Sequence, residues 1–126
     1  MEIDMKVKEI NWIDKNGEEA SVIISDGIFE CAAFSHPCHL KVGDTIFNPL
    51  QFLDEAKAFR VENRNVSITR QLRNNFWSHE IVALVTTKDE NLVQIGQLKI
   101  RLNSLPGDVI NGDFIVCYPS RIDIID

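Results

Sequence analysis

Apolar and polar residues alternate along most of this chain, and this pattern predicts β-strands. In the plainest case, Leu98, Ile100 and Leu102 are apolar, and the residues between them are the charged Lys99 and Arg101. A period of two residues is typical of a strand with one buried face and one face in water. Similar strands are predicted at 5–12, 20–24, 28–34, 45–47, 81–85 and 114–116. The chain is therefore predicted to be all-β and mainly antiparallel.

The first predicted strand contains an irregularity and is followed by a turn. Apolar residues alternate at Met5 and Val7. The phase then shifts by one residue, to Ile10 and Trp12, which predicts a β-bulge. An Asn-Gly dipeptide follows at 16–17 between two apolar runs, and this is the strongest short-range signal for a hairpin.

A second pattern is an internal repeat, in which residues 22–54 align without a gap with residues 91–123. Most of the identical positions are turn formers, and the similar positions are mainly apolar. The identical pairs are Gly27/Gly96, Ser35/Ser104, Pro37/Pro106, Gly43/Gly112, Asp44/Asp113, Ile46/Ile115 and Asp54/Asp123. A chain of 126 residues is too short for two independent barrels, so the copies must share one core. The repeat predicts a single domain, residues 1–126, folded as a small pseudo-two-fold β-barrel from an internal duplication.

Two details of the repeat predict local structure. Gly43 and Asp44, like the second Gly-Asp pair at 112–113, stand at the entrance of a predicted strand. Glycine adopts positive φ at little cost, and the Asp carboxylate accepts hydrogen bonds from nearby backbone amides. Cys31 aligns with Ile100, an apolar position of the alternating strand, so its thiol is predicted to lie in the core.

Residues 55–79 form an insertion that has no counterpart in the repeat. The spacing of Leu50, Leu53 and Ala56 predicts a short helix within 50–59. A hairpin is predicted either in its place or after it from the apolar residues Phe59, Val61, Val66 and Ile68, and we favour the helix followed by the hairpin. Residues 71–79 are predicted to be a loop that packs Phe76 and Trp77 onto the barrel.

The run SDGIFECAAFSHPCHLKVGDTI resembles the middle of an OB-fold barrel. The resemblance rests on the Asp26-Gly27 turn, the alternating strand after it, and Leu40 placed before Gly43-Asp44. The doubled Gly-Asp turn is also similar to the cradle-loop barrels, which are six-stranded folds built from two copies of a strand unit. Both resemblances imply a small closed or partly closed barrel, and neither implies a particular ligand.

Composition excludes several classes of protein. Hydrophobic residues make up 44% and charged residues 25%, which is an ordinary globular balance. No apolar run approaches the roughly 20 residues of a membrane span, so no membrane contact is predicted. Without a signal peptide, and with three cysteines that we expect to be reduced thiols, the cytoplasm is the predicted compartment. The net charge of −6 disfavours unspecific binding of nucleic acid through the whole surface.

The acidic residues near the N-terminus are the first candidate site. The predicted first hairpin carries Glu9, Asp14, Glu18 and Glu19. Charge complementarity speeds encounter with a basic partner, so these residues predict a protein-binding surface. Immunity and inhibitor-type proteins commonly have this size and charge. The alternative is that the carboxylates only keep an edge strand soluble.

The insertion is the second candidate, because it concentrates positive charge beside aromatic residues. Its candidate residues are Arg60, Arg64, Arg70, Arg73 and Trp77. Arginines that hold phosphates and aromatic faces that stack on bases are what single-stranded nucleic acid requires. The alternative is an arginine face that pairs with the acidic body.

Metal binding and catalysis have weaker support. His36, Cys38 and His39 are possible zinc ligands, but the C-x2-C pairs that mark zinc motifs are missing. No G-x-S-x-G elbow, glycine-rich phosphate loop or dinucleotide fingerprint is present. The sequence therefore predicts a non-enzymatic module without a cofactor that binds another protein, with single-stranded nucleic acid as the alternative partner.

Overall fold

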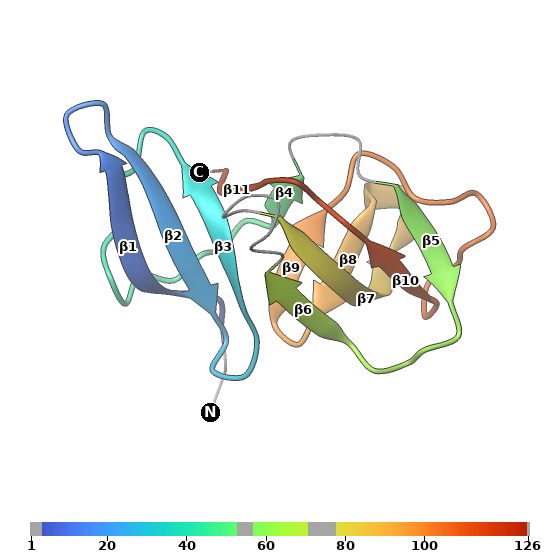
Figure 1. The fold of residues 1–126 in the computed structure, drawn as a ribbon. Helices are drawn as coiled ribbons and strands as arrows, with labels where there is room; N and C mark the ends of the chain where they lie inside the picture. The colour runs from blue at the N-terminus through green and yellow to red at the C-terminus, as the bar shows by residue number, and fades with distance from the viewer. Residues whose placement is uncertain (1–3, 53–56, 71–77, 126) are drawn as a thin grey trace.

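The computed structural model describes residues 4–52, 57–70 and 78–125, and strands dominate it (Figure 1). One 3-10 turn, η1 (Lys88–Glu90), follows the longest strand of the second half. The strands are β1 (Lys6–Asp14), β2 (Glu19–Ser25), β3 (Glu30–Ser35), β4 (Leu50–Phe52), β5 (Ala58–Val61), β6 (Ser67–Arg70), β7 (His79–Thr87), β8 (Leu92–Ile95), β9 (Leu98–Arg101), β10 (Phe114–Cys117) and β11 (Ile122–Asp123). The predicted all-β class is confirmed.

The strands form one mixed sheet in the order β1-β2-β3-β11-β4-β9-β8-β7-β10-β5, and β6 pairs with β7 beside this path. Most neighbours are antiparallel, whereas β11 runs parallel to β3 and β4 runs parallel to β9. The order has two ends, β1 and β5, so the strands that the structure describes do not close into a barrel.

Away from these two ends, β3 and β6 approach each other. Within the described ranges, no strand pairing joins these two strands. Instead, the backbone amide of Ala32 on β3 donates a hydrogen bond of 3.1 Å to Nε2 of His79 on β7. A buried backbone amide must find a partner, and here a side chain replaces a neighbouring strand.

The chain contains two meanders: β1-β2-β3 forms one side of the molecule, and β7-β8-β9 lies in the other part, which ends in β10 and β5 (Figure 1). The register of β1 on β2 shifts between Val7 and Glu9, which confirms the predicted bulge. The predicted Asn-Gly turn joins β1 to β2, and the amide of Gly17 donates to Oδ1 of Asp14 at 3.0 Å.

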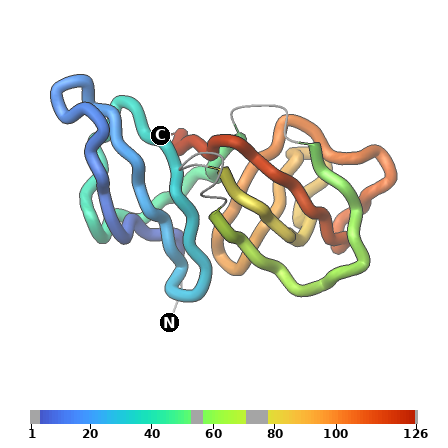
Figure 2. The backbone as a smooth tube through the Cα atoms, viewed as in Figure 1, coloured from blue at the N-terminus to red at the C-terminus, as the bar shows by residue number. Residues whose placement is uncertain are grey.

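The two meanders are joined through exchanged strands at the centre of the sheet. β4 leaves the first meander and pairs with β9 of the second, at Leu50↔Ile100. β11 leaves β10 and pairs with β3 of the first meander, at Asp123↔Phe34. The C-terminal segment can be followed from β10 back to β3 in Figure 2. Each meander is therefore extended by a strand from the opposite half of the chain, and these two strands, β4 and β11, also pair with each other.

The first Gly-Asp turn is fastened to β1 by hydrogen bonds. Gly43 has φ +95° and donates to the carbonyl of Val7 at 2.8 Å, while Val7 donates back to the carbonyl of Asp44 at 2.9 Å. The Asp44 carboxylate accepts from the amide of Lys41 at 2.9 Å. These bonds bring the turn against the outer edge of β1.

The second Gly-Asp turn is fastened to β7 in the same way. Gly112 has φ +96° and donates to the carbonyl of Val85 at 2.9 Å, while Val85 donates back to the carbonyl of Asp113 at 2.8 Å. The Asp113 carboxylate accepts from the amide of Ile110 at 3.0 Å. Both turns therefore have positive-φ glycines and the same hydrogen-bond pattern.

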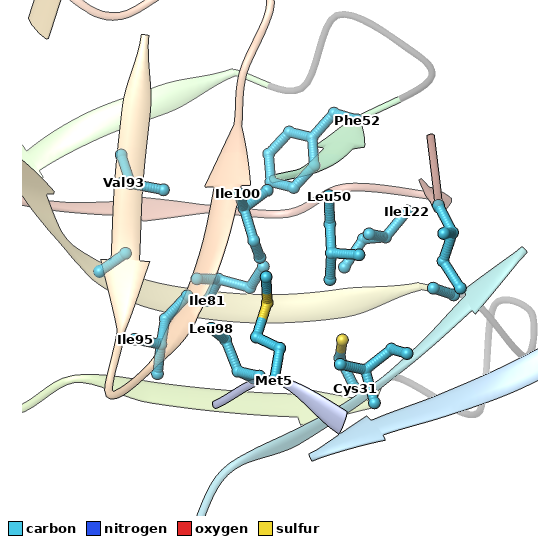
Figure 3. Packing of buried hydrophobic residues seen from close by; sticks show 14 of the residues in the cluster. Met5, Cys31, Leu50, Phe52, Ile81, Val93, Ile95, Leu98, Ile100 and Ile122 are labelled. Atoms are coloured by element: carbon cyan, nitrogen blue, oxygen red, sulfur yellow. The ribbon is translucent and has the colours of Figure 1, made fainter. Parts of the chain in front are cut away.

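Both halves contribute to one buried core (Figure 3). Leu50 and Ile122, from the two exchanged strands, lie together near Ile100 of β9. Cys31 is buried in the same cluster, as its alignment with Ile100 predicted. Met5 reaches this core from the segment before β1.

The predicted helix within 50–59 is wrong for the residues that the structure describes there. Leu50 to Phe52 form strand β4, in which Leu50 and Phe52 are buried and Gln51 is partly exposed. This is the two-residue period of a strand, and pairing with β9 and β11 on both sides favours it.

The predicted hairpin after it is also wrong, although both of its strands exist. β5 pairs with β10, and β6 pairs with β7, so the two strands have different neighbours. The strand predicted at 45–47 is reduced to one bridge between Thr45 and Lys6. The predicted loop residues 71–77, with Phe76 and Trp77, lie outside the described residues.

Candidate functional site

A hollow of about 460 Å³ opens on the β1–β2 hairpin, on the face that points away from the core. It is lined by Glu9, Asn11, Trp12, Ile13, Ser21, Ile23 and Arg70. The pairing of β1 with β2 explains this group, because Glu9 stands opposite Ile23 and Asn11 stands opposite Ser21. Val22, which lies between Ser21 and Ile23 on β2, points to the other face and is buried in the core.

The wall of the hollow is apolar and exposed. Trp12 is 41% exposed and Ile13 is 51% exposed, so the side chains of these two consecutive residues are both in contact with solvent. Trp12 stands opposite Ala20, a core residue, so its indole leaves β1 on the other face from Asn11 and is exposed beside the hollow. A large exposed aromatic residue is characteristic of surfaces that bind other molecules, since its burial contributes more than that of most side chains.

The backbone next to these residues is open as well. β1 is one end of the sheet, and the segment around Gly43 and Asp44 covers only its first residues, up to Val7. From Glu9 to Asp14, no strand in the described parts of the chain pairs with the outer edge of β1. An open edge presents unpaired N–H and C=O groups to which another strand can add.

A buried polar group at this site has no partner among the residues that the structure describes. Ser21 is only 4% exposed, and no described residue forms a hydrogen bond with its Oγ. A buried hydroxyl without a partner costs roughly 1–3 kcal/mol, so each such group calls for an explanation. Because Ser21 lines the hollow, a ligand that enters it is one candidate partner.

A second hollow, of about 470 Å³, lies at the other end of β1 beside Val42 and Gly43. Its buried carboxylate, Asp26, accepts hydrogen bonds from three backbone amides at 2.7–2.8 Å. Its Lys8 is paired with Glu30 at 2.8 Å. These polar groups already have partners, so they indicate a structural role.

The predicted acidic residues lie on the same hairpin as the first hollow, but they do not form one cluster. Glu9 lines the hollow, whereas Asp14, Glu18 and Glu19 lie at the tip of the hairpin. Asp14 caps the turn, and Glu18 Oε2 is 3.0 Å from Nδ1 of the exposed His39. The hairpin therefore combines an apolar hollow with carboxylates along its length.

The predicted arginine strip is divided among different places. Arg60 Nε on β5 lies 3.6 Å from an Asp113 carboxylate oxygen, and the guanidinium of Arg64 lies 5.1 Å from the ring centre of Phe114. Arg70, at the end of β6, lines the hollow on the β1–β2 hairpin instead. Arg73 and Trp77 lie outside the described residues.

The possible zinc ligands are not gathered together. Cys38 is buried, while His36 and His39 are exposed. Among the residues with described positions, no three His, Cys, Asp or Glu side chains are close enough to hold a metal ion. The strands also place Cys31 and Cys117 in the core, where burial raises the pKa of each thiol to about 12. Thiols of this kind stay protonated at neutral pH and are poor nucleophiles.

The sequence did not indicate two features of this surface. His79 was predicted to end a loop, yet it is buried and completes the hydrogen bonding of β3. For Ser21 and Ile23 the sequence predicts only a strand, and no local pattern indicates that their face of β2 lines a hollow. The signal available in the sequence was that β2 carries small or apolar residues at successive positions, so that both of its faces can be buried.

Comparisons with protein-family models, with curated proteins and with solved structures found no match to this chain. In the described part of the chain, no helix has the length and apolar character needed to cross a membrane.

Proposed function

We propose that this chain is a non-catalytic module that binds another protein through the β1–β2 hairpin, and that the partner is basic. The observation that carries this proposal is the exposed Trp12, which stands beside an open hollow on an edge strand. An aromatic anchor, a concave surface and an unpaired backbone edge together are what a peptide-binding surface needs.

The partner that fits this surface is an extended segment that adds to the outer edge of β1. Backbone hydrogen bonds along Glu9–Asp14 would supply affinity, and alternate side chains would enter the hollow. Carboxylates at Glu9, Asp14, Glu18 and Glu19 favour basic side chains in that segment. An immunity or inhibitor-type protein would use such a surface to cover a basic face of its target.

We also infer that the fold is a pseudo-two-fold arrangement derived from two copies of one strand unit. Two observations support this: the Gly43-Asp44 and Gly112-Asp113 turns have the same hydrogen bonds, and each half receives a strand from the other. The β1–β2 hairpin, most of which precedes the first copy, then carries the proposed binding surface.

Titration of the ¹⁵N-labelled protein with an alternating basic peptide, acetyl-RVRVRVR-amide, tests the proposed function. We expect amide shifts confined to Glu9–Asp14 and the hollow, and an affinity that falls as salt rises. The acidic peptide acetyl-EVEVEVE-amide is the control and should cause no shifts. Shifts that map away from the hairpin, or none at low salt, would refute the proposal.

A pair of variants separates specific steering from net charge. Replacing Glu18 and Glu19 by lysine should lower the association rate of the basic peptide about tenfold at low salt. The matched control replaces Asp89 and Glu90, adjacent exposed acids on η1, and changes net charge equally. Equal effects of the two variants would contradict a docking role for the hairpin.

The nucleic-acid alternative is tested with the same labelled protein. A single-stranded oligonucleotide that binds through arginines would shift the amides near Arg60 and Arg64, with a steep salt dependence. The ion pair of Arg60 with Asp113 does not favour that outcome. An oligonucleotide that binds while the basic peptide does not would replace the proposal by this alternative.

A further inference from the structure

We propose that two copies of this chain associate face to face, through the outer surface of β5, β10 and β7, and form a two-fold symmetric dimer. This surface lies in the half of the molecule that does not contain the β1–β2 hairpin (Figure 1). The inference therefore goes beyond the proposed function and does not use its site.

The pairing of three neighbouring strands builds an apolar face on this half. Ile115 and Cys117 of β10 are fully buried in the core, so the residues that alternate with them point to the opposite side of the sheet. On that side, residues that stand opposite one another in the strand pairing form two rows across β5, β10 and β7. Phe59, Val116 and Val82 form one row, and Val61, Phe114 and Leu84 form the other; together they are called the β10 face here.

The β10 face is open to solvent. Phe59 is 55% exposed, and four of the other five residues are only partly buried. Val82 is buried, but it does not belong to the core cluster of the molecule, as expected for a residue on the outer side. Arg64 lies over one end of the face, with its guanidinium 5.1 Å from the ring centre of Phe114. A contiguous exposed apolar surface of this kind is typical of a contact with another protein surface.

The row next to the β10 face carries one charge of each sign. The backbone amide of His79 donates to the carbonyl of Pro119 at 3.0 Å, so the pairing of β7 with β10 continues beyond the end of β10. Tyr118, which is 55% exposed, is therefore placed between Lys57 on the β5 side and Glu80 on the β7 side. A border with one lysine and one glutamate favours neither a polyanion nor a strongly basic segment.

A second copy of the chain matches this distribution of charge. A two-fold axis along β10 places β5 of one copy over β7 of the other, because these strands flank β10 on opposite sides. Phe59 then meets Val82 of the second copy, and Lys57 meets Glu80 of the second copy. In such an isologous contact each pair forms twice. Sheets that pack face to face lie about 10 Å apart, which lets the side chains of both apolar faces interdigitate.

The association state of the protein tests this inference. Light scattering during gel filtration should give about twice the single-chain mass of 14.4 kDa at high concentration, and the mass should fall toward that of one chain on dilution. Phe59→Glu should weaken the association at least about tenfold, because it places a charge among apolar side chains. A protein that stays monomeric at millimolar concentration would overturn the proposal.

Ile110→Glu is the matched control for Phe59→Glu. Ile110 is 65% exposed in the loop before β10, so it is as apolar and as accessible as Phe59 but is not part of the β10 face. Its variant should associate as the parent protein does. Both substitutions change exposed side chains, and far-UV circular dichroism checks that each variant folds. Equal weakening by the two variants would show that the association does not depend on the β10 face.

An exchange of charges tests the two-fold geometry itself. Lys57→Glu alone, or Glu80→Lys alone, brings like charges together across the contact and should weaken the dimer about fivefold at low salt. The double variant restores both pairs with reversed polarity and should regain most of the parent affinity. Single variants without effect, or a double variant as weak as the two losses combined, would refute the placement of the axis along β10.

Discussion

Replacing the glycine of each Gly-Asp turn by alanine should destabilise the protein, and by the same amount at the two sites. Gly43 has φ +95° and Gly112 has φ +96°, a region that residues with a side chain rarely adopt. A methyl group added at either glycine would meet no atom within 4 Å. The cost is therefore backbone strain alone, about 1–2 kcal/mol for each substitution.

Equilibrium unfolding in urea measures this cost, with Gly107→Ala as the matched control. Gly107 lies in the same loop as Gly112 and also has open space, but its φ lies outside the positive range. Gly107→Ala should be neutral or stabilise by about 0.4–1 kcal/mol, because alanine reduces the entropy of the unfolded chain. The slope of the transition should not change, so the shifts in midpoint report stability.

Two results would refute the reasoning. If Gly112→Ala behaves like Gly107→Ala, the strain argument is wrong. If one turn glycine is costly and the other is not, the two turns are not energetically equivalent, and the proposed duplication loses its main support. Costs that agree within about 0.5 kcal/mol are the expected outcome.

Two further predictions concern buried groups. His79→Leu should cost about 1–3 kcal/mol, because the buried amide of Ala32 loses its acceptor, and should speed hydrogen exchange of that amide; unchanged exchange would contradict the role of the imidazole. For Cys31 and Cys117, burial raises the folded-state pKa of the thiols to about 12, so unfolded thiols ionise first as the pH rises. The free energy of unfolding should fall above pH 9, by about 1.4 kcal/mol per thiol at pH 10; a Cys117→Ala protein with the same dependence between pH 8 and pH 10 as the parent would contradict this.

Local patterns predicted the strands and turns well, because these depend on neighbouring residues. Alternation at Leu98 and Ile100, and the bulge after Val7, required only the two-residue period of a strand. The Gly-Asp turns were predicted because positive φ and carboxylate capping are local needs. The prediction of a helix within 50–59 failed because Leu50 fits the three-residue spacing with Leu53 and Ala56 as well as the two-residue spacing with Phe52. The pairing of β4 with β9 and β11 decided between them.

The candidate site was predicted only in part for the same reason. The charge of Glu9 predicts a role in binding, and Glu9 lines the hollow. The sequence does not predict a role for the buried Ser21 and Ile23, since their place at the hollow depends on which segments lie over the outer face of β2. The arginines were grouped by closeness in sequence, but β5 and β6 have different neighbours and carry Arg60 and Arg70 to separate places.

The order of residues is therefore enough to predict the all-β class, the turns and many of the buried positions, because hydrophobic period and turn chemistry act over a few residues. The folded structure settles that β4 and β11 are exchanged, that β3 and β6 lie close together without pairing near His79, and that the exposed Trp12 stands beside a hollow. These features depend on pairing between strands far apart in the chain. Such pairing is set by how all strands together satisfy their backbone hydrogen bonds and bury one core.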